Sequence, residues 1–267
     1  MASAGALANY SRMLQPLAVG LVDELIDVVC FCPLGVDTRP LPSPPVEIVT
    51  YRPLRLWLFR TSALETLADE VRIRKLTLLH ALDAPAAELT QQLARLTGVR
   101  FVVGSYCVTD ARPLRSSGAP SEAILAASGP IRQALIDHKL AVAPKVHVVH
   151  PGVYQVKQAT CFVTEGHSIT IVAGGSLDYY DAFAAVLQTF ATIRDRYQDC
   201  VFFIIGDGRC ESRLRRLAES LELREYVTFT PRQPSSQLAG IFKAADIYIS
   251  PARSACLDIE SLLAIAS

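Results

Sequence analysis

The chain lacks a net charge, and it lacks any apolar stretch long enough to cross a membrane. Its 26 Lys and Arg residues balance its 26 Asp and Glu residues, whereas a dedicated nucleic-acid-binding protein carries a clear basic excess. No apolar run reaches the roughly 18–20 residues of a membrane-spanning helix. The first residues, MASAGALANYSRM, lack the basic start and apolar core of a signal peptide. These absences predict a cytoplasmic protein that binds no nucleic acid.

The cysteines lack the pattern of a zinc site. There are seven, an odd number, and only Cys30 and Cys32 form a close C-x-C pair. No second pair or histidine cluster completes a set of four ligands. We therefore expect reduced cysteines in the core of a cytosolic protein, and no metal.

The chain is rich in apolar residues and long enough for more than one domain. Hydrophobic residues make up 51% of its 267 positions, which excludes disorder as the main state and suits two small domains. Apolar strands alternate with amphipathic helices, the clearest of which span residues 181–197 and 210–222. This alternation predicts an α/β fold with parallel sheets. The strands are expected at 27–34, 76–82, 99–105, 122–128, 145–151, 168–175, 200–208, 226–231 and 246–251.

Two irregular stretches divide the pattern. Residues 33–53 are proline-rich and predict a surface excursion after the first strand. Residues 150–168 show little periodicity, so the domain boundary is placed there, between residues 1–150 and 151–267. Residues 52–60 hold three arginines around Trp57 and Phe59. A weak contact with an anionic membrane surface, at the inner face, is one interpretation; solvated arginines of an ordinary loop are the favoured one.

The most informative motif is a strand that ends in Gly206-Asp207-Gly208 and is followed by a helix. Glycines there permit a tight turn and a close backbone approach, and a helix N-terminus attracts anions. The motif is not the G-x-G-x-x-G dinucleotide fingerprint, because Glu211 occupies the third glycine position.

The neighbouring motifs follow in a specific order. After the glycine turn come a helix, the strand VTFT at 227–230 and FKAADIYISP at 242–251. Upstream, a strand ends at Ser128, a helix follows with Pro130 in its first turn, and VHVVHPGV leads onward. This order resembles the GT-B glycosyltransferases of the retaining family 4 type. The resemblance covers almost the whole chain and is strongest from residue 122 onward.

The resemblance implies two Rossmann-like domains in a GT-B arrangement, residues 1–150 on the acceptor side and 151–267 binding the nucleotide sugar. It implies sugar transfer from a nucleotide-diphosphate donor to a glycan or lipid-linked acceptor, with retention of configuration. The donor is a substrate, so no cofactor is expected, and basic side chains can stabilise the leaving diphosphate without a metal. Family members begin with a strand before the position of Gly5 and continue past residue 267 with more strands. The chain is therefore expected to be truncated, without the first strand and the last strands.

Several family positions carry unexpected residue types. At the two positions where family members carry cations that bind the donor phosphates, this chain has Ser176 and Asp181. The position of the family's first-domain histidine is occupied by Tyr106. The positions of the two glutamates of the E-x7-E motif are occupied by Ala255 and Leu263. A hydrogen bond to a charged group contributes about 1.5–3 kcal/mol. Losing two would weaken diphosphate binding by about a hundred- to ten-thousandfold.

Other family positions keep their chemistry. Gly5 matches the second glycine of the N-terminal loop beneath donor and acceptor. Arg232 lies where the family reads the nucleobase and is the nearby basic group left to hold a phosphate; a solvated loop arginine is the alternative. Glu260 could replace the ribose contact, although an exposed acid in a first helical turn is the favoured alternative. The strand-end turns keep three glycines: Gly175, Gly206 and Gly208.

Two function hypotheses of different classes remain open. The first is a divergent glycosyltransferase that uses a nucleotide-sugar donor. The second is a catalytically inactive homologue that binds a protein partner or a glycan. The family resemblance favours the first, and the substituted positions favour the second. The incomplete glycine fingerprint disfavours an oxidoreductase.

Overall fold

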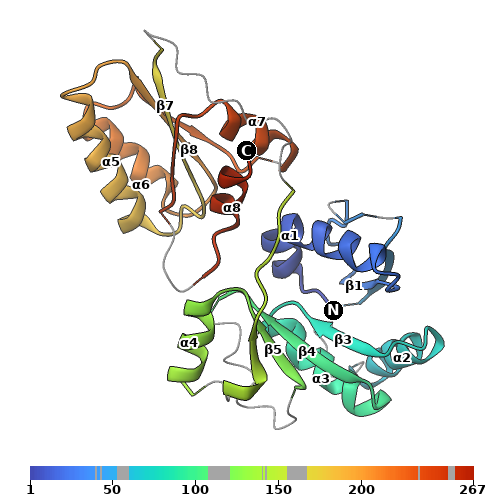
Figure 1. Cartoon of the computed structure of the whole chain (residues 1–267). Helices are drawn as coiled ribbons and strands as arrows, with labels where there is room; N and C mark the ends of the chain where they lie inside the picture. Colours follow the sequence, from blue (N-terminus) through green and yellow to red (C-terminus); the bar gives the residue numbers. More distant parts are fainter. Residues whose placement is uncertain are drawn as a thin grey trace. The chain divides into compact units, whose positions relative to one another are not determined.

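The chain divides into two compact α/β units (Figure 1). Unit 1 comprises Met1–Gly152 and the short segment Ser254–Leu257, and unit 2 comprises Val153–Arg253 and Asp258–Ser267. The chain therefore leaves unit 2 for a few residues and then returns to it. The computed structural model describes residues 1–39, 41–42, 44–52, 60–107, 121–139, 141, 143–154, 167–233, 235–251 and 256–267.

Unit 1 contains two parallel sheets. Strands β1 (Val29–Pro33) and β2 (Glu47–Tyr51) pair with each other. The second sheet has the order β3 (Leu78–Ala81), β4 (Arg100–Ser105), β5 (Ala123–Ala126) and β6 (Val146–Val148). Met1 and Ala2 lie between the sheets, because the Ala2 N–H donates to Phe31 O and the Leu82 N–H donates to Met1 O, at 3.0 and 3.1 Å.

The helices of unit 1 begin and end at residues suited to those positions. They are α1 (Ala4–Asp23), α2 (Arg60–Ile73), α3 (Ala84–Thr97) and α4 (Gly129–Asp137), with a 3-10 turn at Ala143–Lys145. Asp83 caps α3 by accepting the Ala86 N–H, and Gly98 ends that helix with a φ of 72°. Ser128 caps α4 ahead of Pro130, as the sequence predicts. Apolar side chains of α2 and α3 pack on β3 and β4 around Leu67, Val71, Leu93 and Phe101.

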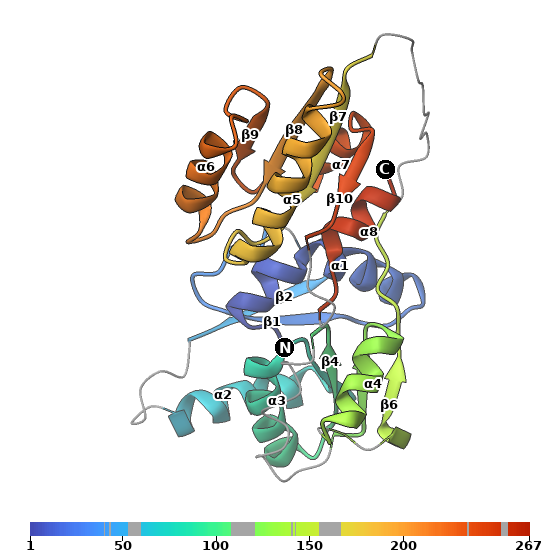
Figure 2. The same cartoon turned by 90° about the vertical axis from the view of Figure 1, so that its left-hand side faces the viewer.

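Unit 2 is a sheet with helices on both faces (Figure 2). The parallel strands have the order β10 (Ile247–Ile249), β7 (Ile169–Gly174), β8 (Cys200–Ile205) and β9 (Val227–Thr230). Ile171 and Ala173 of β7 face α5 (Tyr180–Arg194) and α6 (Glu211–Ser220). Val172 faces the opposite side, where α7 (Ser235–Lys243) and α8 (Ile259–Ile265) contribute Leu238, Phe242 and Leu263. Burial of both faces explains the nearly unbroken apolar runs of these strands.

The α/β class with parallel sheets is confirmed, and each of the expected strand regions contains a strand. The proline-rich stretch differs from the prediction, because its last part forms β2. Val49 and Tyr51 of that strand pack against the core of unit 1, and the strand pairs in parallel with β1. The proposed membrane-contact stretch lies largely outside the described residues, since only Arg52 and the backbone of Arg60 fall within them. Among the described helices, none is both long and apolar enough to cross a membrane.

Candidate functional site

The carboxyl ends of the four parallel strands of unit 2 form one edge of its sheet, and the predicted donor-binding residues of this unit gather there. Gly175 and Ser176 follow β7, Gly206 and Gly208 follow β8, and Arg232 follows β9. In open α/β sheets, ligands bind outside the carboxyl ends of the strands. The topology therefore brings these residues to the edge where a ligand of this fold class binds.

The loops after β7 and β8 are in direct backbone contact. The Gly175 N–H donates to Ile205 O and the Leu177 N–H donates to Asp207 O, both at 3.0 Å. A Cβ atom on Gly206 would lie 2.0 Å from Gly175 O, and one on Gly208 would lie 2.4 Å from the carbonyl carbon of Leu177. Real Cβ atoms do not approach backbone so closely, so both positions need glycine. Gly175 itself has a φ of 145°, which favours glycine as well.

Asp178 joins the exposed parts of these two loops. The Arg209 N–H donates to Asp178 Oδ1 at 2.8 Å, and the Arg209 guanidinium lies 3.3 Å from the same oxygen. These contacts hold the pKa of Asp178 below its ordinary value. Ser176, at the first family cation position, is exposed and bonds to Asp178 at 3.4 Å. Asp181, at the second, lies exposed in the first turn of α5, where a carboxylate interacts favourably with the helix dipole.

Arg232 and Glu260 form an ion pair at the same edge. Arg232 Nη2 lies 3.5 Å from Glu260 Oε1, and the side chains are 43% and 16% exposed. The Arg232 N–H also points to the Asp207 carboxylate, at 3.4 Å. Glu260 is therefore mostly buried and paired, and the expectation of an exposed helix acid is wrong. The pair joins the loop after β9 to α8, although the residues are far apart in the sequence.

The ion pair lies over the end of β7, the central strand of the site. A Cβ on Gly174 would contact Glu260 Cγ and Tyr248 Oη, both at 3.5 Å. Burial, followed by the charges of Asp258 and Glu260, raises the pKa of Tyr248, so its phenol stays neutral. The Asp258 carboxylate caps α8 by accepting the Glu260 N–H at 3.1 Å and also bonds to Ser250 and Ser261. Sequence reasoning missed Tyr248, which had no motif to mark it, and it did not foresee that Asp258 caps α8.

The remaining predicted residues lie elsewhere. Leu263 packs in the apolar layer beneath α7 and α8, which explains why that position is not a carboxylate. Ala255 lies outside the described residues. Gly5 is in the first turn of α1 in unit 1. Tyr106 follows β4 and is 6% exposed, and its ring is tilted by 43° against the ring of Tyr10, with centroids 4.6 Å apart.

A disulfide joins Cys107 to Cys256 in unit 1, immediately beyond Tyr106. The expectation that the cysteines are reduced is therefore wrong for this pair. Cys30, Cys32, Cys200 and Cys210 are free thiols. The bonded residues are 149 positions apart, and no local sequence pattern reports a contact over that separation.

The comparisons with known proteins agree with this architecture. The crystal structure of a glycosyltransferase from Rickettsia africae superposes with a TM-score of 0.71 and 14% identity. The match covers 91% of this chain and 70% of the Rickettsia chain. Anabaena HepE, solved with UDP and glucose, superposes with a TM-score of 0.61 and 13% identity. The match covers 82% of this chain and 65% of the HepE chain. The fold is thus that of the GT-B glycosyltransferases.

The family-model match falls on unit 2 and the segment that crosses into unit 1. Residues 163–262 match the family model of the glycosyl transferases group 1. An uncharacterized glycosyltransferase of Haemophilus influenzae is 28% identical over 97 residues, covering 36% of this chain and 27% of its own. The alpha-monoglucosyldiacylglycerol synthase of Streptococcus pneumoniae is 30% identical over 98 residues, which cover 37% of this chain and 22% of the synthase. The matched region spans about a quarter of these relatives' lengths.

Proposed function

We propose that the protein is a glycosyltransferase that transfers a sugar from a nucleotide-diphosphate donor to a glycan or lipid-linked acceptor, with retention of configuration. The observation that carries this proposal is the Arg232–Glu260 pair over the end of β7. It puts one cation and one carboxylate at the edge where ligands of this fold class bind. A nucleotide diphosphate needs both, a cation for its phosphates and a carboxylate for its ribose hydroxyls.

Arg232 is the residue suited to the diphosphate. Its guanidinium is half exposed, always charged, and able to donate two parallel hydrogen bonds to phosphate oxygens. Arg209 is less suited, because its backbone and side chain are already engaged by Asp178. As the sugar leaves, negative charge grows on the β-phosphate, and a cation aimed there stabilises the transition state. Arg232 would thus serve donor binding and departure of the leaving group.

Glu260 is suited to hold Arg232 in the empty site and the ribose in the filled one. The paired arrangement keeps the guanidinium at the edge of the sheet before the donor arrives. When phosphate oxygens bind the guanidinium in place of Glu260, the carboxylate can accept hydrogen bonds from ribose hydroxyls. The donor is then held by a polar pair whose two members exchange partners.

Nucleotide binding tests the proposal. Calorimetry with UDP, GDP and ADP should give micromolar affinity for at least one of them. Arg232→Ala removes a charged hydrogen bond of about 1.5–3 kcal/mol and should weaken binding by about 10- to 150-fold. Arg224→Ala is the matched control. It removes the same charge from an exposed turn ahead of β9, at the opposite end of that strand, and should leave the affinity unchanged.

Two outcomes would reject the proposal or its site. Absence of binding to all three nucleotides would exclude a nucleotide-sugar enzyme. Binding that Arg232→Ala and Arg224→Ala weaken equally would place the nucleotide away from Arg232. Release of the nucleotide from a labelled nucleotide sugar then separates an active enzyme from one that only binds.

A catalytically inactive homologue is the second candidate. Ser176 and Asp181 stand where two phosphate-gripping cations are expected, and the Asp178 and Asp207 carboxylates lie in the adjoining loops. This local excess of negative charge opposes a diphosphate. Under this candidate the protein binds a protein partner or a glycan, and no nucleotide affects its unfolding temperature.

The location of the protein is part of the proposal. We infer a cytoplasmic enzyme in which solvated arginines are the favoured interpretation of residues 52–60, and a weak contact with the inner membrane face is the alternative. Three arginines lie in that stretch, and each basic residue near an anionic surface adds about 1 kcal/mol. Co-sedimentation with anionic and neutral vesicles tests the contact. Equal recovery with both would exclude it.

A further inference from the structure

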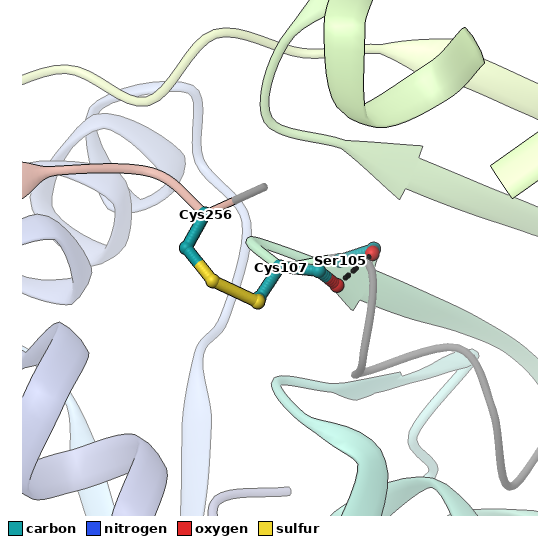
Figure 3. Close-up of a disulfide and its surroundings, with 3 residues drawn as sticks. All are labelled: Ser105, Cys107 and Cys256. Carbon is teal, nitrogen blue, oxygen red and sulfur yellow. Dashed lines mark hydrogen bonds between the residues drawn. A yellow bond between two sulfur atoms is a disulfide. The ribbon is translucent and has the colours of Figure 1, made fainter. Parts of the chain in front are cut away.

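The disulfide anchors a short piece of chain that links two parts of unit 2 (Figure 3). Cys107 follows β4, and Cys256 belongs to Ser254–Leu257, the segment that the chain contributes to unit 1 before it returns to unit 2. The two cysteines also form an antiparallel backbone bridge, and the Leu257 N–H donates to Tyr106 O at 2.7 Å. One covalent bond and one strong hydrogen bond thus hold the same segment.

The two cysteine residues differ in exposure. Cys107 is 8% exposed, and Ser105 Oγ donates to its carbonyl oxygen at 3.0 Å. Cys256 lies exposed. A dissolved thiol can therefore reach Cys256, whereas Cys107 is shielded. In thiol–disulfide exchange, access decides which sulfur is attacked.

The anchored segment leads directly into the candidate site. Asp258, the cap of α8, follows Leu257 at once, and Glu260 in the first turn of α8 pairs with Arg232. Release of residues 254–257 from unit 1 would remove the restraint on the start of that helix. No other described cysteine is placed to do this, because the four free thiols lie on β1, β8 and the turn before α6.

We propose that Cys107–Cys256 is a thiol-exchange site, opened by dithiol reductants through Cys256, that fixes the segment leading into α8 to unit 1. A reductant thiolate attacks Cys256 Sγ, the sulfur–sulfur bond breaks, and the Cys107 thiolate leaves and takes up a proton. The second thiol of the reductant then attacks the mixed disulfide and releases Cys256. Two electrons pass to the protein, the reductant becomes a disulfide, and a small oxidised disulfide reverses both steps.

Hydrogen exchange at the Leu257 amide measures the proposed restraint. In protein equilibrated with oxidised glutathione, that amide should be protected, because both the covalent link and the Tyr106 carbonyl hold it. After reduction with dithiothreitol the covalent link is lost while the hydrogen bond to Tyr106 O remains, and exchange should become at least about tenfold faster, as expected for a local opening. Peptide mapping with an alkylating reagent should label Cys107 and Cys256 in the reduced protein only.

Variants separate this site from general thiol effects. Cys256→Ser should show the fast exchange of the reduced protein and no response to dithiothreitol. Cys210→Ser is the matched control, since it removes a partly exposed free thiol of unit 2, and should keep the full response. If the variant at Cys256 fails to fold, reduction of the unaltered protein still gives the comparison.

The proposal is overturned if Cys107 and Cys256 are alkylated in protein equilibrated with oxidised glutathione. It is also overturned if the Leu257 amide exchanges at the same rate in both redox forms. A redox-dependent affinity for UDP is a further expectation that rests on the proposed function. If the amide responds to reduction but no nucleotide binds, the exchange site stands and the proposed function fails.

Discussion

Replacing Gly206 by alanine would place a Cβ atom 2.0 Å from the carbonyl oxygen of Gly175. Real Cβ atoms essentially never come closer than 3.0 Å to another atom, so the loop after β7 must retreat by at least about 1 Å, since cores tolerate little overpacking. That loop is held by the hydrogen bonds from Gly175 to Ile205 and from Leu177 to Asp207. A shift of this size lengthens both bonds beyond a useful distance.

The expected cost is about 3 kcal/mol. Overpacking in a well-packed region costs roughly 1–3 kcal/mol, and each lost hydrogen bond costs about 1 kcal/mol. Alanine restricts the unfolded chain and returns about 0.4–1 kcal/mol. For a chain of this size a loss of 3 kcal/mol corresponds to a fall of about 6–12 °C in Tm.

Urea unfolding followed by far-ultraviolet circular dichroism measures this cost. The helices α5 and α6 pack on the affected strands, so the helical signal reports on unit 2. Gly240→Ala is the matched control, because Gly240 lies inside α7 and its Cβ would meet nothing within 4 Å. Helix propensity predicts that the control stabilises the protein by up to about 1 kcal/mol.

The reasoning fails if Gly206→Ala unfolds within 0.5 kcal/mol of the unaltered protein, a margin that surface substitutions rarely exceed. It also fails if both variants lose the same stability. Either result would mean that the two loops separate at little cost. The glycines would then have to be explained by a ligand rather than by the contact between the loops.

Two further predictions concern single side chains. Burial lowers the pKa of His80 to about 4 from its ordinary 6.5, so between these values the unfolded chain binds a proton that the folded chain does not. The free energy of unfolding should therefore fall by up to about 3 kcal/mol as the pH drops from 6.5 to 4. Urea titrations of His80→Gln should lack this part of the slope, and an unchanged slope would contradict the assignment. For the partly exposed Arg232–Glu260 pair, a double-mutant cycle with alanine at both positions should give a favourable coupling of about 0.2–1 kcal/mol. A coupling of zero or of opposite sign would refute the pair.

The sequence predicted β7 and β8 well because both faces of these two inner strands are largely buried. Nearly unbroken apolar runs of β-branched composition then mark them strongly, at Ile169–Gly174 and Cys200–Ile205. The strand Glu47–Tyr51 escaped prediction because it is short and follows a run of prolines, which normally indicates a loop. Its pairing with β1 depends on residues that the local pattern does not include.

The candidate site was only partly predictable. Family motifs drew attention to Arg232 and Glu260 separately, but their contact arises because the first turn of α8 lies over the end of β7, within reach of the loop after β9. Local sequence does not report such a contact. The same holds for Asp258, whose carboxylate gathers Ser250, Ser261 and a backbone N–H only once β10 and α8 are in place.

The return of Ser254–Leu257 to unit 1 has a practical consequence for anyone who wishes to study the units apart. A cut after Gly152 gives a first piece with an orphan Cys107 and a second piece with an exposed orphan Cys256. In an oxidising buffer each piece would tend to form covalent dimers through the cysteine that has lost its disulfide partner. Serine at both positions removes that artefact, and mixing the two unaltered pieces offers a direct way to see whether they find each other and close the bond.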